Sequence, residues 1–419
     1  MSQRKRSVIV IAAFILFVAL TLYAAQNRLR AQIAEIEREV SDIRGLERLR
    51  ETTLAFRSRD QILAEGAEEP PSPDEDMERL YAFYRALDLI PPDLDLAQAF
   101  REYLSANVAG YFEFEAEEIT ILRKPRMQHA PLTIFERLLY AHEFVHVLQD
   151  QHYDLKQIWE RVGDSENFDL WLATDALIEG DAETVTWDVL DLLIARLSAR
   201  ELDYLWRQAE QAMSVADSPQ QAPAVIAAAV NFPYEHGEAF VRQLVERFGW
   251  ERVHLAFTSD PPQSTEQIYH PERYLAGEPP IEVSLPDFSE IIGDEPRQVY
   301  DGAVGEFYLR QHLMTNLKQT RAAAAASGWG GDRLRIYKDS AADELLWVWH
   351  LVWDGEGDAF EFAEAYRRFL DLRYDPVQAD GRCWRQETTH CLRQIGERET
   401  RISMAADQDT ALALLALDA

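Results

Sequence analysis

Apolar residues recur at intervals of three and four along most of the chain, which is the period of an amphipathic helix. The pattern predicts helices over residues 77–89, 96–107, 134–148, 168–178, 189–213, 360–370 and 410–417. Alternating apolar and polar positions predict a short strand over 52–58, a hairpin over 110–122 and strands over 345–353, 384–388, 392–396 and 400–404. We therefore expect an α+β fold that is mostly helical, with most of its strands in the C-terminal third.

The longest apolar run lies near the N-terminus. Residues 7–25 are uncharged and about as long as a segment that crosses a bilayer, and Arg4, Lys5 and Arg6 precede them. Because positive charge stays on the cytoplasmic side, we expect a single-pass transmembrane helix with an extracytoplasmic body. A cleaved signal peptide is the alternative, but no small-x-small site ends the run, which favours an uncleaved anchor.

A charged helical segment follows the apolar run. Leu29, Ile33, Ile36, Val40 and Ile43 are spaced by four and three, as in a short coiled coil. This spacing predicts a juxtamembrane helix, which either self-associates weakly or serves as a solvated spacer. An acidic, proline-rich linker is predicted after it, over residues 65–76.

The helix predicted over 134–148 carries the sequence His142-Glu143-Phe-Val-His146 after a capping-box pattern of Thr133 and Glu136. Histidines four residues apart leave the same helix face, so both imidazoles can bind one metal ion. Glu143 then stands beside the open coordination position, where it can take a proton from water. The pattern therefore predicts a zinc hydrolase. The alternative is a helix with two core histidines, whose burial costs free energy unless they are paired.

A catalytic zinc site needs a third protein ligand. His152 follows His146 by six residues and would face away from it on a helix. Glu179 is the better candidate, because small neighbours such as Gly180 allow another helix to approach closely. Glu183 lies one turn further on and could hydrogen-bond a ligating imidazole. Each acid could instead lie on an ordinary solvated helix face.

The sequence His-Glu-Phe-Val-His followed by Glu-Gly-Asp-Ala-Glu resembles the gluzincin metallopeptidases, in particular a group of membrane-anchored bacterial members. Segments 108–112, 148–155, 232–237, 264–274 and 328–332 also resemble that group. The resemblance implies one Zn²⁺ per chain bound by His142, His146 and Glu179, and a peptide or protein substrate. It also implies a zincin-like core, made of the HExxH helix, a glutamate helix and a small hairpin or sheet before them. The corresponding division of the chain is 1–25 (cytoplasmic tip and anchor), 26–72 (stalk and linker), 73–290 (catalytic domain) and 291–419 (C-terminal α+β portion).

Two residues outside the ligand set are candidates for stabilising the oxyanion of a tetrahedral intermediate. Metallopeptidases often use a neutral histidine or a tyrosine for this purpose. Tyr234 and His270 are our candidates, and both lie in irregular segments. His270 could instead cap backbone groups of its loop.

Charge and cysteine content narrow the function further. The net charge of −31 argues against nucleic acid as a partner, because phosphate binding needs clustered Lys and Arg. Cys383 and Cys391 lie eight residues apart and could form a disulfide in an oxidising compartment or remain two buried thiols.

The sequence leaves two functions open. The first is an exported, membrane-anchored zinc peptidase, expected to be an endopeptidase, with Glu143 as general base. The second is a non-catalytic envelope scaffold or assembly factor, in which the metal only braces helices. The intact Glu143 favours the peptidase, because a structural zinc site closes its fourth position and needs no base.

Overall fold

The computed structural model describes residues 3–417 except 63–74, 125–126, 128–129, 164, 204, 208–221, 294, 340–343 and 377–381. The side chains of residues 3–20, 22, 75 and 375–376 also lie outside the description. Most of the predicted linker over 65–76 falls on residues that are not described.

The chain forms two compact units, and each is assembled from separate stretches of sequence. Unit 1 comprises residues 1–70, 104–156 and 181–220, and unit 2 comprises 71–103, 157–180 and 221–419. Helix α7 (Phe168–Ile194) runs without a break through the boundary between Gly180 and Asp181. The domain boundaries predicted from the sequence stay a prediction.

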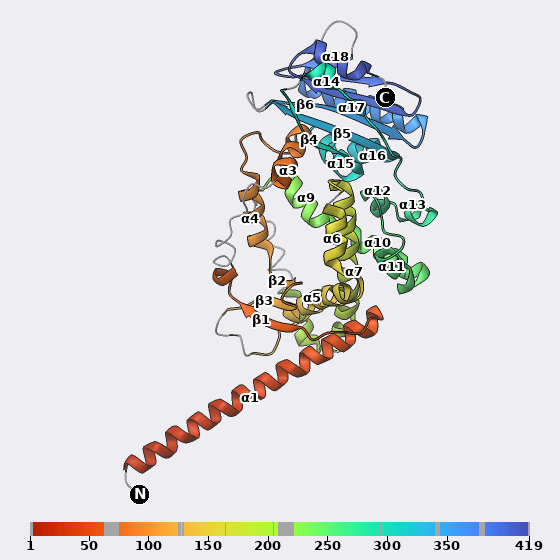
Figure 1. Ribbon diagram of the computed structural model, residues 1–419. Coiled ribbons are helices and arrows are strands. Elements are labelled where there is room, and N and C mark those ends of the chain that lie inside the picture. The colour runs from red at the N-terminus through yellow and green to blue at the C-terminus, as the bar shows by residue number, and fades with distance from the viewer. Residues whose placement is uncertain are drawn as a thin grey trace. The chain divides into compact units, whose positions relative to one another are not determined.

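Unit 1 is built around helix α5, which packs on a small sheet and on helix α1 (Figure 1). Its elements are α1 (Gln3–Arg44), β1 (Thr53–Arg57), β2 (Gly110–Glu113), β3 (Glu118–Leu122) and α5 (Ile134–Tyr153). The strand order is β1-β3-β2, with β1 parallel and β2 antiparallel to β3. The predicted hairpin is thereby confirmed, and strand β1 adds to it.

The sequence specifies α5 at both ends. The Thr133 side chain accepts from the Glu136 backbone, and the Glu136 side chain accepts from the Thr133 backbone. Glu136 is also paired with the buried Arg123. The helix ends at Asp154, whose left-handed backbone (φ 56°) stops further helical hydrogen bonding. Phe144, Val145 and Leu148 are fully buried, so α5 is a core helix.

The C-terminal end of α1 belongs to the core of unit 1. Ile36 and Val40, two of the heptad-spaced residues, are fully buried, and α1 packs against α5. The spacing of four and three therefore reflects burial against the chain's own helix.

Unit 2 contains most of the helices and a larger sheet. The helices are α3 (Glu75–Ala86), α9 (Ala224–Phe232), η2 (Pro233–Gly237), α10 (Glu238–Phe248), α11 (Trp250–Phe257), α12 (Thr265–Tyr269), α13 (Pro271–Ala276), α14 (Ser289–Ile292), α15 (Gly305–Met314), α16 (Gln319–Ala326), α17 (Glu356–Arg373) and α18 (Gln408–Ala416). Two further helices, α4 (Leu96–Asn107) and α6 (Leu155–Gly163), continue from one unit into the other.

Seven antiparallel strands form the sheet of unit 2 in the order β4-β5-β6-β10-β9-β8-β7. They are β4 (Arg297–Gly302), β5 (Trp329–Asp339), β6 (Glu344–Trp353), β7 (Asp375–Pro376), β8 (Cys383–Arg385), β9 (Thr389–Gln394) and β10 (Glu399–Ala405). Trp353 of β6 stacks on Phe362 of α17, whereas Val348 on the opposite face of β6 packs with Leu414 of α18. Both faces are thus covered by helices (Figure 1).

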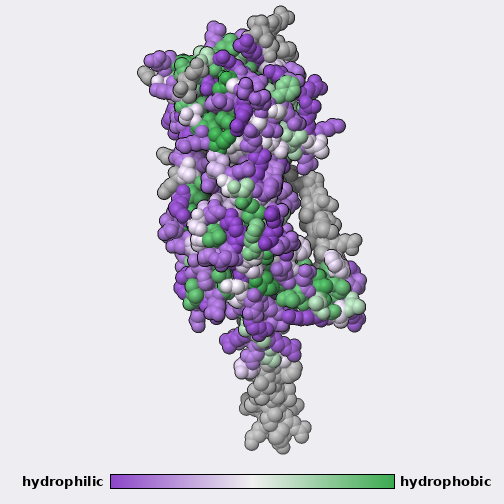
Figure 2. Space-filling model, turned by 90° about the vertical axis from the view of Figure 1, so that its right-hand side faces the viewer, coloured by the Kyte–Doolittle hydropathy of each residue, from purple (hydrophilic) through white to green (hydrophobic). Residues whose placement is uncertain are grey.

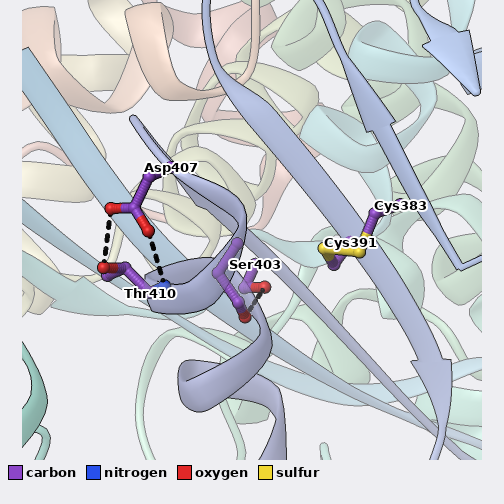
Figure 3. Close-up of a disulfide and its surroundings, with 6 residues drawn as sticks. Cys383, Cys391, Ser403, Asp407 and Thr410 are labelled. Atoms are coloured by element: carbon purple, nitrogen blue, oxygen red, sulfur yellow. Dashed lines mark hydrogen bonds between the residues drawn. A yellow bond between two sulfur atoms is a disulfide. The ribbon is translucent and has the colours of Figure 1, made fainter. Parts of the chain in front are cut away.

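Cys383 and Cys391 are directly opposite each other on β8 and β9 and form a disulfide (Figure 3). Of the two alternatives that the sequence left open, the structure has the disulfide. The bond closes the hairpin whose second strand also pairs with β10. The nearby helix α18 is capped by Asp407, which accepts from Thr410, and Ser403 donates to the Ala411 carbonyl.

Two parts of the predicted fold class are wrong. Within the described part of the chain, no helix is long and apolar enough to cross a membrane. A span needs ~20 consecutive apolar residues. The first described side chains of α1 are those of Thr21 and Tyr23, and the charged Arg28 and Arg30 follow shortly after them. This finding overturns the predicted anchor over residues 7–25 and the single-pass localisation that depended on it. Most side chains of that run lie outside the described residues.

The second correction concerns the zincin-like core. The structure is α+β, but a zincin core is not shown. The strands that precede α5 form a three-stranded sheet, and its strand β1 comes from the segment that the sequence assigned to the stalk. The sequence pattern identifies β1, β2 and β3 as strands, but not the pairing of β1, whose partner lies more than 60 residues away. The face shown in Figure 2 is mostly hydrophilic, in keeping with 73 acidic against 42 basic residues.

Candidate metal centre

Helix α5 carries His142, Glu143 and His146 on adjoining turns. Glu143 and His146 are buried, with 6% and 9% of their surface exposed. The Nε2 atoms of His142 and His146 lie 3.2 Å apart, so both rings point at one place, as their spacing on a helix predicts.

Hydrogen bonds fix which ring nitrogen of His146 carries the proton. Gln149 Nε2 donates to Asp181 Oδ2 at 2.9 Å, and because a carboxylate only accepts, the amide oxygen of Gln149 faces the other way. That oxygen lies 2.8 Å from His146 Nδ1, which must therefore donate to it. The proton of His146 is on Nδ1, and Nε2 presents a lone pair.

The ring of His142 has an acidic side chain beside its Nδ1 atom. Its Nδ1 lies 3.5 Å from Glu183 Oε2, which attracts the ring proton to that nitrogen. A proton on Nδ1 leaves the Nε2 atom of His142 with a lone pair. Glu183 therefore lies beside the imidazole of His142, and its role as the partner of a metal ligand stays a prediction.

When both rings carry their proton on Nδ1, two nitrogen lone pairs face each other at 3.2 Å and repel unless a cation lies between them. Two nitrogen ligands at 2.0–2.1 Å from a tetrahedral zinc are themselves ~3.3 Å apart. The observed separation therefore fits a shared metal ion. Neutral imidazoles with defined tautomers are also the donors that zinc prefers.

Glu179 supplies a third donor from α7. One ligand atom from each of His142, His146 and Glu179 lies within 4.8 Å of the other two. Among the described residues, these three form the group that could hold a metal ion. Helix α7 is continuous, and Asp181 and Glu183, two and four residues after Glu179, bind Gln149 and His142 of α5.

The backbone of η2 crosses α7 next to Glu179. A Cβ atom on Gly180 would lie 2.2 Å from the Gly237 carbonyl group, and one on Gly237 would lie 2.0 Å from the Ala176 oxygen. The sequence analysis expected Gly180 to let another helix approach closely. Within unit 2, the element that approaches it is η2. A single π-helical turn of this kind often marks a functional site.

Tyr234 and His236 lie on η2 and so belong to this crossing. Tyr234 is 40% exposed. The His236 ring packs against Phe232 and Tyr269, and burial lowers its pKa, which keeps the imidazole neutral near pH 7. Of our two oxyanion candidates, Tyr234 is therefore on an element that contacts α7 beside a ligand.

A pocket of about 400 Å³ opens on the same side of η2 as His236. The pocket has an apolar lining that includes Phe232, Phe307 and Met314. On the polar side of the pocket, the guanidinium carbon of Arg310 lies 3.8 Å from the ring centroid of Tyr269. Its volume is in the range of pockets that bind small ligands or side chains.

His270 has a different set of contacts. It lies between α12 and α13, and its Nε2 is 3.1 Å from Glu306 Oε2. Glu306 is fully buried and also pairs with Arg310. The His270 imidazole therefore pairs with a buried carboxylate, which is a structural role. The role of His270 in stabilising an oxyanion stays a prediction.

Buried acids hold the N-terminal end of α7. Asp169 accepts from the backbone and side chain of Thr265, and burial raises its pKa to about 8. Burial likewise raises the pKa of Glu266 to about 9. Gly305 leaves room for Asp169, because a Cβ atom there would lie 1.8 Å from Asp169 Oδ1.

Gln149 and Asp181 are site residues that the sequence analysis missed. Gln149 follows His146 by three residues, so on a helix it lies on the same face as that ligand. Asp181 is the central acid of Glu-Gly-Asp-Ala-Glu and is fully buried. The helical spacing of Gln149 was the available signal, whereas the sequence contained none for its pairing with Asp181.

Comparisons with known proteins give little beyond the geometry. The family described as a domain of unknown function (DUF8575) matches residues 295–414, which lie in the C-terminal part of unit 2. Among curated proteins there is no match. The chain is similar to a solved structure from Chloroflexus aurantiacus, described as a "putative hydrolase with a novel fold". The identity is 13%, the match covers 60% of this chain and 89% of that one, and the TM-score is 0.36. At that score the similarity carries no argument about this chain, so its candidate chemistry rests on the metal centre.

Proposed function

We propose that this protein is a zinc-dependent peptidase. The observation that supports the metal is that the Nε2 atoms of His142 and His146 lie 3.2 Å apart and are grouped with a carboxylate oxygen of Glu179. Two histidines and a carboxylate leave a fourth zinc position open, which is the arrangement of catalytic rather than structural sites.

The chemistry follows from the neighbours of that open position. A zinc ion, when bound, supplies a Lewis acid that activates water and polarises a carbonyl oxygen. Glu143, which follows a ligand directly on α5, takes the proton from the attacking water and passes it to the leaving amine. Gln149 and Glu183 hold the imidazoles in the ligating tautomer. Tyr234 is our candidate for a hydrogen bond to the developing oxyanion.

The small sheet of unit 1 supports a peptide as the substrate. Strand β2 lies at the sheet edge in the order β1-β3-β2, and an edge strand can pair with an extended peptide. Gly110 at its start is so close to α5 that a Cβ atom would lie 3.1 Å from Leu139, three residues before His142. An extended chain on this edge would therefore run beside the metal helix.

Metal analysis combined with peptide cleavage tests the proposal. The purified full-length chain should contain about one zinc, and it should cut members of a peptide library in a way that a chelator abolishes and added zinc restores. A protein that binds zinc but cuts no peptide would support the alternative of a metal-braced scaffold. A protein that binds no zinc would overturn the assignment of the centre.

A further inference from the structure

Arg44, the last residue of α1, is a buried cation. Its side chain is 2% exposed, and its Nε lies 2.6 Å from Oδ1 of the fully buried Asp181. Its Nη2 also donates to the Tyr153 hydroxyl at 3.2 Å. Burying a guanidinium costs several kcal/mol unless it is paired with good geometry, so these contacts specify where α1 ends in unit 1.

The ion pair continues to a metal ligand. Asp181 uses one carboxylate oxygen for Arg44 and the other for Gln149 Nε2. Gln149 in turn accepts from His146 Nδ1. A buried chain of four side chains thus connects α1 with the zinc-facing imidazole. All four residues belong to unit 1.

The arrangement of donors and acceptors along these four side chains decides which ring nitrogen of His146 carries the proton. Arg44 forms an ion pair with one oxygen of Asp181 and the Gln149 amide group donates to the other, so both oxygens of that carboxylate are held in place. With Asp181 fixed, the amide oxygen of Gln149 must face His146. A reversed amide would offer N–H groups to Nδ1, and the ring would then carry its proton on Nε2, where the metal should bind.

We propose that Arg44 is a positioning residue of the metal centre, and that α1 completes the zinc site by fixing Asp181, Gln149 and the ligating tautomer of His146. This inference rests on the proposed zinc centre. The inference adds to the proposed centre, because the zinc affinity of the centre then depends on α1, a helix that contributes no ligand. Outer partners of ligating histidines typically change metal affinity by about 10–100-fold.

Another contact of α1 provides a matched control. Gln32 donates to the Leu132 carbonyl and accepts from the Leu132 amide, which ties α1 to the segment that precedes α5. Gln32→Ala should weaken the packing of α1 without touching the chain from Arg44 to His146. Arg44→Met keeps an unbranched apolar stem and removes the charge and the donors.

The experiment measures the zinc dissociation constant of the full-length chain by competition with a chromophoric chelator, together with the thermal midpoint. Arg44→Met should bind zinc about 10–100-fold more weakly than wild type, and Arg44→Lys should recover part of the loss. Gln32→Ala should lower the thermal midpoint of the metal-free protein but leave the dissociation constant unchanged. Unchanged zinc affinity in Arg44→Met, or equal losses in Arg44→Met and Gln32→Ala, would overturn the inference.

A double variant keeps the test decisive if the single variant folds poorly. Replacing a buried ion pair by apolar residues is often neutral for stability, so Arg44→Met/Asp181→Leu should fold better than Arg44→Met alone. Gln149 then lacks its acceptor, and zinc affinity should stay low. Recovery of wild-type affinity in the double variant would contradict the positioning role. Failure of wild type to bind zinc would instead remove the proposed function, so the two failures are distinguishable.

Discussion

Gly180 of α7 and Gly237 of η2 bring two backbones into direct contact, with no space for a Cβ atom at either position. Gly180 follows Glu179 directly, and η2 carries Tyr234. A close contact of backbone with backbone cannot be relieved by rotating a side chain. The crossing therefore sets where the η2 residues lie relative to the turn of α7 that carries the third candidate ligand.

Gly180→Ala should disturb stability and zinc binding together. The added methyl group meets backbone atoms at 2.2 Å, so α7 and η2 must separate, and overpacking of this kind costs ~1–3 kcal/mol or more. Zinc content should fall because Glu179 moves with its helix. Calorimetry and metal analysis of the purified variant measure both effects.

Gly357→Ala is the matched control for that substitution. Gly357 lies in α17, and a Cβ atom there would meet nothing within 4 Å. The change should leave zinc content unaltered and raise stability slightly, because alanine is the better helix former by roughly 0.5–1 kcal/mol. If Gly180→Ala behaves like Gly357→Ala, the crossing does not position the ligand.

Stability should fall as pH rises from about 4 towards about 8. Asp169 has a folded-state pKa raised to about 8 by burial, so the folded protein holds a proton that the unfolded chain releases near pH 4. The stabilisation is complete below the unfolded pKa and is lost as pH rises through the folded one, at up to about 1.4 kcal/mol per pH unit.

Asp169→Asn isolates this effect, because the amide keeps an acceptor for Thr265 and does not titrate. Denaturant unfolding at intervals between pH 4 and pH 9 should show a shallower pH dependence in the variant than in wild type. Part of the slope should remain, because Glu266 has a raised pKa from the same cause, burial. Identical slopes in both proteins would show that Asp169 is ionised in the folded state.

The disulfide should contribute measurably to the sheet of unit 2. It closes a loop with a sequence separation of eight between Cys383 and Cys391, which corresponds to about 2–3 kcal/mol of stabilisation in the chain-entropy treatment. Reductant should therefore lower the thermal midpoint of wild type. The Cys383→Ser/Cys391→Ser variant should have a similarly low midpoint and should not respond to reductant. A midpoint that neither reductant nor substitution changes would contradict this contribution.

Local sequence signals predicted the parts of the site that lie on single helices. The capping box of Thr133 and Glu136 and the spacing of His142 and His146 depend on residues within one or two turns, and the structure has both. The position of Glu183 beside His142 could be anticipated because acid, ligand and helix period are all visible in the sequence.

Relationships between distant segments could not be predicted in the same way. The buried Asp181 pairs with Arg44, 137 residues earlier, and helical periodicity shows that a face is buried but not what covers it. Ile36 and Val40 illustrate the same limit, since their heptad spacing was interpreted as a stalk but both are fully buried on a helix that packs against α5. The apolar run over residues 7–25 was interpreted by length alone, and the structure contradicts its assignment as a membrane span.

Loss of each candidate ligand should reduce zinc content. His146→Ala and Glu179→Ala should each lose most of the metal, because a three-ligand site tolerates the loss of one ligand poorly. Glu183→Ala should retain zinc with about 10–100-fold weaker affinity, since Glu183 contacts His142 and not the metal position. Metal analysis after dialysis against a weak chelator ranks the variants. Full zinc retention in Glu179→Ala would exclude that carboxylate as the third ligand.

Glu143→Gln separates the peptidase from the metal-braced scaffold. The substitution keeps the size of a side chain that is 6% exposed, and Glu143 is not among the grouped ligands, so zinc content and thermal midpoint should barely change. It removes the group placed to take a proton from the attacking water, and loss of a general base typically costs about 10²–10⁴-fold in rate. Peptide cleavage should therefore fall to near background. Glu160→Gln, at an exposed position of α6, is the control for the chemical change and should cleave at the wild-type rate. If Glu143→Gln also cleaves at that rate, the base lies elsewhere and the mechanism proposed for α5 is wrong.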